Sequence, residues 1–307
     1  MRTREAQSRE RSVNLSDITE IELLILKKMR ELTIGEHRSV SHGAGFDFVG
    51  LREWQAGDRS SSIDWAQSTL RNFNPLVVRE FEQPSTAGVV VVADSSLSTR
   101  CGMDGVPIAA AIARVIATIG MSAVFFQDLF SLITFDAGFR QMAAVRPRVG
   151  KNHVLHCLDA YQLGRGLQEV KQTDSLSTTL AGLMRKTSLI SIVSDFLFEK
   201  PREVLQELSQ LNSVHDVFLV IIESAFAFDL PAISAGWIEV FDVETGRTET
   251  FSRKRFRQLA ARVTAWQDEV AAAARELALD TLLWGSDQGR NDAALIQFVA
   301  ERRLRKA

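Results

Sequence analysis

The chain has 307 residues, of which 46% are hydrophobic and 24% are charged, and its formal net charge at pH 7 is −2. This apolar fraction is sufficient for a sizeable core and excludes a disordered chain. The nearly balanced charge gives no basic patch for nucleic acid, so we expect no nucleic-acid partner. The length predicts either one large α/β domain with an additional module or two domains.

Cysteine usage and the N-terminal segment predict the compartment. Cys101 and Cys157 are the only cysteines, which excludes a disulfide framework and a Cys-x-x-Cys metal site. The first ten residues, MRTREAQSRE, lack the apolar core of a signal peptide. The apolar stretch 106–126 approaches the length of a membrane span but contains Arg114, and we interpret it as a buried helix. We therefore expect a cytoplasmic protein without a membrane span.

The first 86 residues predict a small α+β accessory module. Apolar residues recur at helical spacing from 15 to 32, with Asn14 or Ser16 as the helix cap. From 35 to 86 the sequence is rich in glycine, polar residues and aromatics, which is typical of short strands and ordered turns. Within this module we expect Trp54 and Trp65 to lie in the core or at its interface.

From residue 87 to 307, alternating strands and helices predict a doubly wound, mostly parallel sheet. A hairpin inserted at about 237–252 is predicted by the alternating residues around the Glu-Thr-Gly-Arg turn. The predicted strands are 88–94, 129–135, 188–194, 216–222 and 280–284, with a candidate edge strand at 138–145. The predicted helices are 105–119, 151–161, 178–186, 201–211, 253–278 and 291–304.

The first predicted strand of the sheet ends in a cluster of oxygen-bearing side chains. Four consecutive valines lead into Asp94, and Ser96 and Ser98 follow at i+2 and i+4. Parallel sheets bind ligands at the carboxyl ends of their strands. One carboxylate and two hydroxyls are hard donors that suit Mg²⁺ or Mn²⁺. The alternative is a helix cap, in which these side chains accept hydrogen bonds from the amides of a following helix.

Two other candidate ligands lie where the predicted sheet would bring them near Asp94. Asp195 follows the apolar strand 188–194 and would end at the same edge of the sheet. Thr178 begins a predicted helix, where its hydroxyl would either ligate a metal or cap the helix. Two apolar strands that both end in aspartate favour a metal site, because hard cations usually take one or two protein carboxylates together with hydroxyls and waters.

This set of residues resembles the metal-ion-dependent adhesion site of von Willebrand factor A-like domains. The resemblance implies that Asp94, Ser96, Ser98, Thr178 and Asp195 hold Mg²⁺, either directly or through water. An open coordination position would then accept a carboxylate from a partner protein. Adhesion sites usually have glycines before their threonine, whereas Leu176 and Ser177 precede Thr178 here.

The sequence upstream of the cluster resembles the bacterial domain-of-unknown-function 58 family. The resemblance covers about 35 to 200 strongly and rests on the segments GAGFDFVGLREW (43–54), GD (57–58), IDW (63–65) and VREF (78–81). Family members commonly carry a basic residue just before the Ile-Asp-Trp element, where this chain has serines at 60–62. The resemblance implies a domain without established catalytic activity, often encoded beside MoxR-type AAA+ ATPases. The implied role is that of a partner or adaptor in metal insertion or in remodelling protein complexes.

We therefore expect a non-enzymatic, metal-dependent interaction protein that works with a MoxR-type AAA+ ATPase. One alternative is a metal-dependent hydrolase that uses Asp94 and Asp195, although the cluster has no adjacent His or Lys to act as a base. Another is a vestigial metal site, with the aromatic N-terminal module binding the partner. His153, His156 and Cys157 have a spacing that could hold zinc, but we interpret them as a solvated helix face with a buried thiol.

Overall fold

The computed structural model describes residues 13–35, 47–55, 63–70, 73, 75–82, 87–100, 102–103, 106–136, 138–225, 237–241, 248–285 and 287–305. The chain divides into two compact units, one made of 1–32 with 87–307 and the other of 33–86. The larger unit is an α/β sandwich that contains the predicted sheet. The smaller unit contains a two-stranded sheet and a short helix.

A seven-stranded sheet forms the centre of the larger unit, in the order β13-β10-β9-β3-β6-β7-β8. The five strands from β13 to β6 run parallel, whereas β7 and β8 are antiparallel to their neighbours. This confirms the doubly wound, mostly parallel α/β class. The strands are β3 (Gly88–Asp94), β6 (Leu129–Asp136), β7 (Gln141–Arg148), β8 (Gln168–Glu169), β9 (Ser188–Ser194), β10 (Asp216–Ile222) and β13 (Asp280–Trp284).

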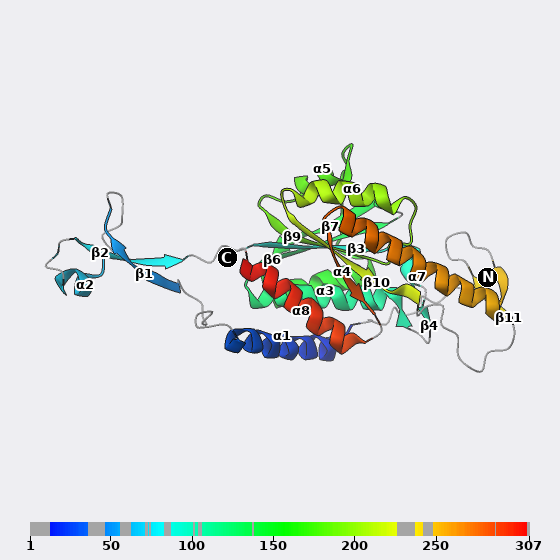
Figure 1. The fold of residues 1–307 in the computed structure, drawn as a ribbon, viewed down its shortest axis with the longest axis horizontal. Coiled ribbons are helices and arrows are strands. Elements are labelled where there is room, and N and C mark those ends of the chain that lie inside the picture. The colour runs from blue at the N-terminus through cyan, green and yellow to red at the C-terminus, as the bar shows by residue number, and fades with distance from the viewer. Residues whose placement is uncertain are drawn as a thin grey trace. The chain divides into compact units, whose positions relative to one another are not determined.

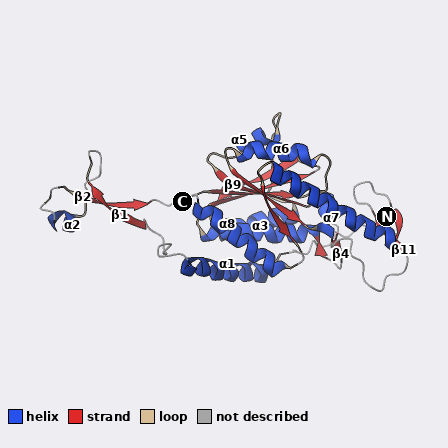
Figure 2. Ribbon diagram, viewed as in Figure 1, coloured by secondary structure: helices blue, strands red, loops and turns tan. Residues whose placement is uncertain are grey.

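Helices cover both faces of this sheet, which is why its central strands are apolar without alternation. Val89 and Val91 face one core cluster, and Val90 and Val92 face the other. Figures 1 and 2 show α1, α3 and α8 on one side and α5, α6 and α7 on the other. The helices are α1 (Leu15–Gly35), α3 (Ile108–Phe125), α4 (Lys151–Leu163), α5 (Leu176–Gly182), α6 (Pro201–Asn212), α7 (Arg253–Glu276) and α8 (Gln288–Arg305).

Helix α3 is the long apolar segment that was predicted to be a buried helix. Among the described residues it alone is long and apolar enough to cross a membrane, but 72% of it is buried inside the protein. Ile112, Ile116 and Ile119 are fully buried in the core on the α3 side of the sheet. The helix runs to Phe125, six residues beyond its predicted end, because its apolar pattern continues to that point.

The close approach of α3 to α4 depends on Gly120. A Cβ atom added there would lie 2.6 Å from Val154 Cγ1 and 3.2 Å from Phe130 Cζ. Alanine raises helix propensity by about 1 kcal/mol, but overpacking a core costs about 1–3 kcal/mol. Gly120→Ala is therefore expected to lower the free energy of unfolding in urea titrations. Gly182→Ala in α5 is the matched control, because an added Cβ there meets nothing within 4 Å, and it is expected to be neutral or stabilising.

Helix α1 belongs to the larger unit, whereas the sequence analysis placed it in the N-terminal module. Its spacing of apolar residues was predicted correctly, and Asn14 caps it by accepting hydrogen bonds from the amides of Ser16 and Asp17. Its apolar face, which includes Ile18 and Ile21, lies in the same core cluster as α3 and α8. The helix was placed wrongly because its partners come from segments about 100 to 280 residues away in the sequence.

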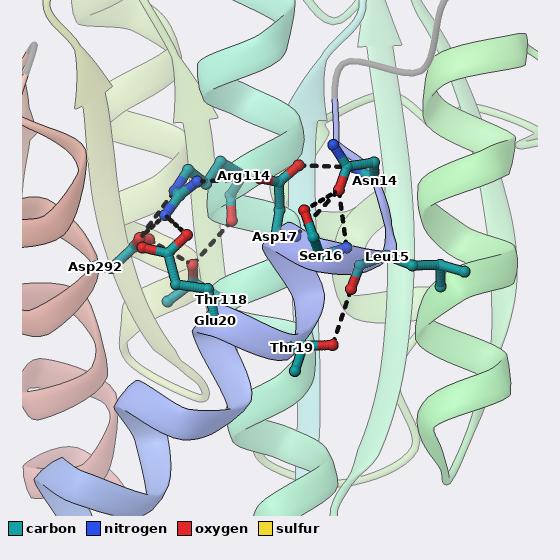
Figure 3. A network of polar contacts seen from close by, with 9 residues as sticks. All are labelled: Asn14, Leu15, Ser16, Asp17, Thr19, Glu20, Arg114, Thr118 and Asp292. Carbon is teal, nitrogen blue, oxygen red and sulfur yellow. Dashed lines mark hydrogen bonds and ion pairs between the residues drawn. The ribbon is translucent and has the colours of Figure 1, made fainter.

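A buried ionic network joins α1, α3 and α8 (Figure 3). Arg114 of α3, whose side chain is 9% exposed, lies 2.7 Å from Asp292 Oδ2 on α8. Its guanidinium also faces Asp17 at 3.9 Å and Glu20 at 3.6 Å, both on α1. Thr118 donates a hydrogen bond of 2.8 Å to the other oxygen of Asp292. One arginine in the middle of the apolar helix thus connects three helices that are distant in sequence.

The smaller unit pairs β1 (Asp47–Glu53) with β2 (Val77–Glu82) in antiparallel fashion and adds α2 (Trp65–Leu70). The buried Ser68 of α2 accepts a 2.9 Å hydrogen bond from the amide of Val77, which ties the helix to β2. Trp54 and Trp65 were expected in the core or at the module interface. They are 41% and 58% exposed and are therefore not core residues, whereas their place at an interface stays a prediction.

The inserted hairpin is confirmed as β11 (Trp237–Phe241) and β12 (Thr248–Ser252). Its turn residues lie outside the described part of the chain. Helix α7 begins at Arg253, directly after β12, and Ser252 caps it by accepting a hydrogen bond from the amide of Arg255. The hairpin is therefore continuous with α7.

Candidate functional site

The candidate site lies at the carboxyl ends of β3, β6 and β9, where the chain order reverses across the sheet. After β3 the chain adds β6 on one side and later returns to add β9 on the other. This is the position at which open parallel sheets bind ligands. Asp94 ends β3, Asp136 ends β6, and Asp195 follows β9 directly.

Asp94 is the centre of a tight cluster of hydrogen bonds. Its Oδ1 accepts from the amide of Ser96 at 2.9 Å and from the hydroxyl of Ser96 at 2.6 Å. Its Oδ2 accepts from the hydroxyl of Ser194 at 2.6 Å. The hydroxyls of Ser96 and Ser98 are 3.1 Å apart. The Asp-x-Ser-x-Ser spacing therefore brings three oxygen-bearing side chains together, as predicted.

The carboxylate of Asp94 is nearly enclosed, with 3% of the residue exposed. Burial raises the pKa of Asp94 above its ordinary value, because a charged carboxylate loses hydration there, and the negative charge of Asp136 adds to this effect. The hydrogen bonds from Ser194 and Ser96 partly oppose it. A positive charge at this position would offset both the lost hydration of the Asp94 carboxylate and its repulsion by Asp136.

The backbone of Asp94 is fixed from the helical layer by Tyr161. The tyrosine hydroxyl donates a 2.8 Å hydrogen bond to the carbonyl oxygen of Asp94. Burial raises the pKa of Tyr161, with the nearby charge of Asp94 acting in the same direction, so the hydroxyl remains a donor. The sequence analysis missed this contact because 67 residues separate the two partners.

An open cleft of about 650 Å³ lies above the cluster. Four of the five predicted ligands line it, namely Asp94, Ser96, Ser98 and Asp195. Asp136 lines it as well, and the sequence analysis missed this residue. The signal was present, because a third predicted apolar strand also runs directly into an aspartate. Charged side chains from α6 and from the segments that precede β7 and α6 form its rim, and they include Arg140, Glu199, Lys200, Glu203 and Glu207.

Asp195 is buried beside the cleft. Its Oδ1 accepts a 3.1 Å hydrogen bond from the amide of Leu197, and its carbonyl oxygen accepts one of 2.9 Å from Gln267 of α7. The segment from Asp195 to Lys200 then forms one wall of the cleft.

Thr178 is not among the residues that line the cleft. It lies exposed in the first turn of α5. Ser175 is the N-cap, and its hydroxyl accepts from the amide of Thr178 and donates to the hydroxyl of Thr178. The hydroxyl of Thr178 therefore neither lines the cleft nor caps the helix, because Ser175 is the cap. The Ser/Thr-rich run satisfies helix amides because these side chains accept bonds from the first-turn N–H groups.

The chemistry of the donors fits a hard divalent cation. Octahedral Mg²⁺ has ligands at about 2.0–2.1 Å, so adjacent ligand oxygens lie about 2.9 Å apart. The oxygen pairs Asp94–Ser96 and Ser96–Ser98, at 2.6 and 3.1 Å, are close to that spacing. Among the described residues, no group of three or more His, Cys, Asp or Glu side chains is placed to hold a metal. The set that fits therefore combines one carboxylate with serine hydroxyls.

The other candidate metal set, His153, His156 and Cys157, forms internal contacts. His153 Nε2 lies 3.0 Å from the carbonyl oxygen of Phe130 and 3.6 Å from Cys157 Sγ. Burial raises the pKa of the Cys157 thiol to about 12, so the metal-free thiol is protonated at neutral pH. The thiol is buried as predicted, but His153 is buried too, so the prediction of a solvated helix face is wrong for that residue.

Comparison with protein families gives a match over the larger part of the chain. A model described as a protein of unknown function, DUF58, matches residues 50–270. No curated protein matches the chain.

Several solved structures are similar to part of the chain at low sequence identity. An aerotolerance-related membrane protein from Bacteroides fragilis NCTC 9343, carrying multiple mutations to serines, is 12% identical over 70% of this chain and 99% of that one, with a TM-score of 0.39. The conserved hypothetical protein BatB from Bacteroides thetaiotaomicron is 12% identical over the same shares, with a TM-score of 0.36. The pilus adhesin SpaC from Lactobacillus rhamnosus GG is 10% identical over 72% and 30%, with a TM-score of 0.35. Likenesses this distant carry no argument about the site.

Proposed function

Since the chain belongs to the DUF58 family of proteins of unknown function, we propose that it is a non-enzymatic adaptor that binds a partner protein through a divalent cation. The observation that carries the proposal is the oxygen cluster of Asp94, Ser96 and Ser98 at the base of an open cleft. These three residues would hold Mg²⁺ or Mn²⁺. Asp136 and Asp195 line the same cleft and would add negative charge around it.

The residues of the cluster have distinct tasks in this proposal. Asp94 supplies the charge, and Ser96 and Ser98 supply neutral oxygens, so the protein's own ligands neutralise only part of a divalent charge. A bound cation would offer an open coordination position to a carboxylate of the partner. Ser194 and Tyr161 keep Asp94 in place by bonding one carboxylate oxygen and the backbone carbonyl.

The shape and charge of the surroundings favour a protein partner. A second cleft of about 750 Å³ shares Asp136 and Arg140 with the first, so the two hollows adjoin. Charges of both signs stand on the rim, among them the pairs Arg140–Glu199 at 3.8 Å and Lys200–Glu203 at 2.9 Å. Such a broad polar surface suits a folded protein or an extended segment. The family resemblance suggests a MoxR-type AAA+ ATPase as the partner and a cytoplasmic setting.

The family resemblance favours the adaptor over a hydrolase. Hydrolysis needs a general base beside the activated water, and the carboxylates that line the cleft, such as Glu203, are the candidates for that role. Among the described residues that line the cleft there is no histidine. The one lysine, Lys200, donates a 2.9 Å hydrogen bond to Glu203. Metal-dependent turnover of a phosphoester or peptide that Asp94→Asn removes would reverse this preference.

Binding to a purified MoxR-type ATPase, measured by biolayer interferometry, tests the proposal. The complex is expected in millimolar Mg²⁺ and is expected to disappear in EDTA, because the cation bridges the two proteins. Asp195→Asn is expected to weaken it, whereas Asp268→Asn on the exposed surface of α7 is the matched control and is expected to leave it unchanged. A complex that is indifferent to EDTA would contradict the metal bridge and favour binding by the aromatic N-terminal module.

A further inference from the structure

The segment that leaves β9 has a backbone that needs external support. It runs from Asp195 to Lys200 and forms one wall of the cleft. Phe196 and Lys200 have φ angles of 57° and 56°, in the left-handed region that residues with a Cβ atom rarely adopt. Such conformations persist when the surrounding contacts hold them.

Two neighbouring residues of α7 supply that support from outside the cleft. The buried Gln267 donates from Nε2 to the carbonyl oxygens of Asp195 at 2.9 Å and Ile222 at 2.7 Å. Trp266 donates from its ring nitrogen to the carbonyl oxygen of Phe196 at 2.8 Å. Two successive carbonyl groups of the wall are thus held by two successive side chains of one helix.

The hydrogen bonds continue from this wall to Asp94. The amide of Phe196 donates a 2.9 Å bond to the hydroxyl oxygen of Ser194. That hydroxyl in turn donates its proton to Asp94 Oδ2 at 2.6 Å. Because the Phe196 amide takes the acceptor side of the hydroxyl, the Ser194 proton is directed at the carboxylate. The direction of this proton therefore depends on where the Phe196 backbone lies.

We propose that Gln267 and Trp266 are positioning residues of the metal cleft. They hold the Asp195–Phe196 backbone, and through it they orient both the Asp195 carboxylate and the Ser194 hydroxyl toward the position next to Asp94. This inference rests on the proposed metal site. It assigns control of metal affinity to α7, whose hydrogen bonds to the wall go to backbone carbonyl groups and not to the side chains of predicted ligands. Contacts that orient the groups around a metal typically change its affinity by about 10-fold to 100-fold.

Mn²⁺ binding to the full chain, measured by electron paramagnetic resonance, tests the inference. Gln267→Met keeps the side-chain length and removes the donor, and it is expected to raise the Mn²⁺ Kd about tenfold. Trp266→Phe keeps an aromatic ring and removes only the N–H group, and a smaller rise in Kd, about threefold, is expected. Both variants are also expected to speed hydrogen exchange at the Phe196 and Leu197 amides in metal-free protein.

Ala274→Gly is the matched control, because it lies two turns further along α7 and is fully buried. Glycine destabilises a helix interior, so this variant is expected to lower Tm while the Mn²⁺ Kd stays unchanged. Unchanged affinity in both positioning variants, with normal binding by the wild type, would overturn this inference alone. An equal loss of affinity in Ala274→Gly would also overturn it. A wild-type chain that binds no Mn²⁺ would overturn the proposed function together with it.

Discussion

Replacing Arg114 with methionine is expected to lower the free energy of unfolding by about 3–5 kcal/mol, because it leaves a buried charge without its partner. Asp292 is 1% exposed, and Arg114 pairs with it at 2.7 Å. The same substitution removes the cation that faces Asp17 and Glu20 of α1. Urea unfolding followed by circular dichroism measures the effect. We also expect faster hydrogen exchange in α1 than in the rest of the unit.

Two control variants test whether the loss of stability comes from leaving a buried charge unpaired and not simply from removing an ion pair. Arg202→Met removes an exposed pair with Glu276, in which the side chains are 70% and 63% exposed, and it is expected to cost no more than about 1 kcal/mol. The double variant Arg114→Met with Asp292→Leu replaces both charges by apolar groups and is expected to recover most of the loss. Equal costs for Arg114→Met and Arg202→Met would contradict the buried network.

The second large effect is expected at Asp94, where Asp94→Asn should abolish stabilisation by Mg²⁺. A ligand at a hundred times its Kd stabilises a protein by about 2.7 kcal/mol, which raises Tm by about 5 °C or more in a unit of this size. Asparagine keeps the shape of the side chain but removes the charge that attracts the cation. The Tm of Asp94→Asn is therefore expected to be the same in Mg²⁺ and in EDTA.

The same variant is expected to stabilise the metal-free protein at neutral pH. The pKa of Asp94 is raised in the folded state by burial. A carboxyl group of this kind contributes stability below its unfolded pKa, and this contribution is lost as the pH rises through the folded pKa. In EDTA, the wild type should therefore lose stability relative to Asp94→Asn as the pH rises from about 4 to neutral. Parallel pH profiles of Tm for the two proteins would show that burial does not destabilise the charged form of Asp94.

The sheet was predictable because its central strands are covered on both faces. Such strands appear in the sequence as continuous apolar runs, and the bounds of β3, β9, β10 and β13 match the predicted ranges residue for residue. Helix ends were less predictable: α3 extends six residues beyond its predicted end and α5 ends four residues early. Apolar periodicity locates a helix more reliably than it locates its last turn.

The candidate site was predicted in part. The cluster around Asp94 and the approach of Asp195 follow from local spacing and from the rule on strand ends. Asp136 obeys the same rule, because it directly follows a predicted apolar strand as Asp195 does, but it was not included among the predicted ligands. Thr178 was predicted to be either a metal ligand or a helix cap, whereas Ser175 of the same Ser/Thr-rich run is the cap that the structure contains.

Contacts between distant segments were not predictable from one sequence. Gln267 meets Asp195 across 72 positions, and Arg114 meets Asp292 across 178. No local pattern marks either partner, since a glutamine or an aspartate on an amphipathic helix is ordinarily solvated. For the same reason, the amphipathic pattern of α1 predicted a helix but did not predict the surface on which it packs.

Isothermal titration of Mg²⁺ into the metal-free chain tests most directly whether the cluster at Asp94 holds a divalent cation. We expect saturable binding at one site in the wild type and no binding in Asp94→Asn. The exposed-surface variant Asp268→Asn should bind as the wild type does. Absence of saturable binding at millimolar Mg²⁺ and Mn²⁺, or binding that Asp94→Asn leaves intact, would contradict a metal site at Asp94.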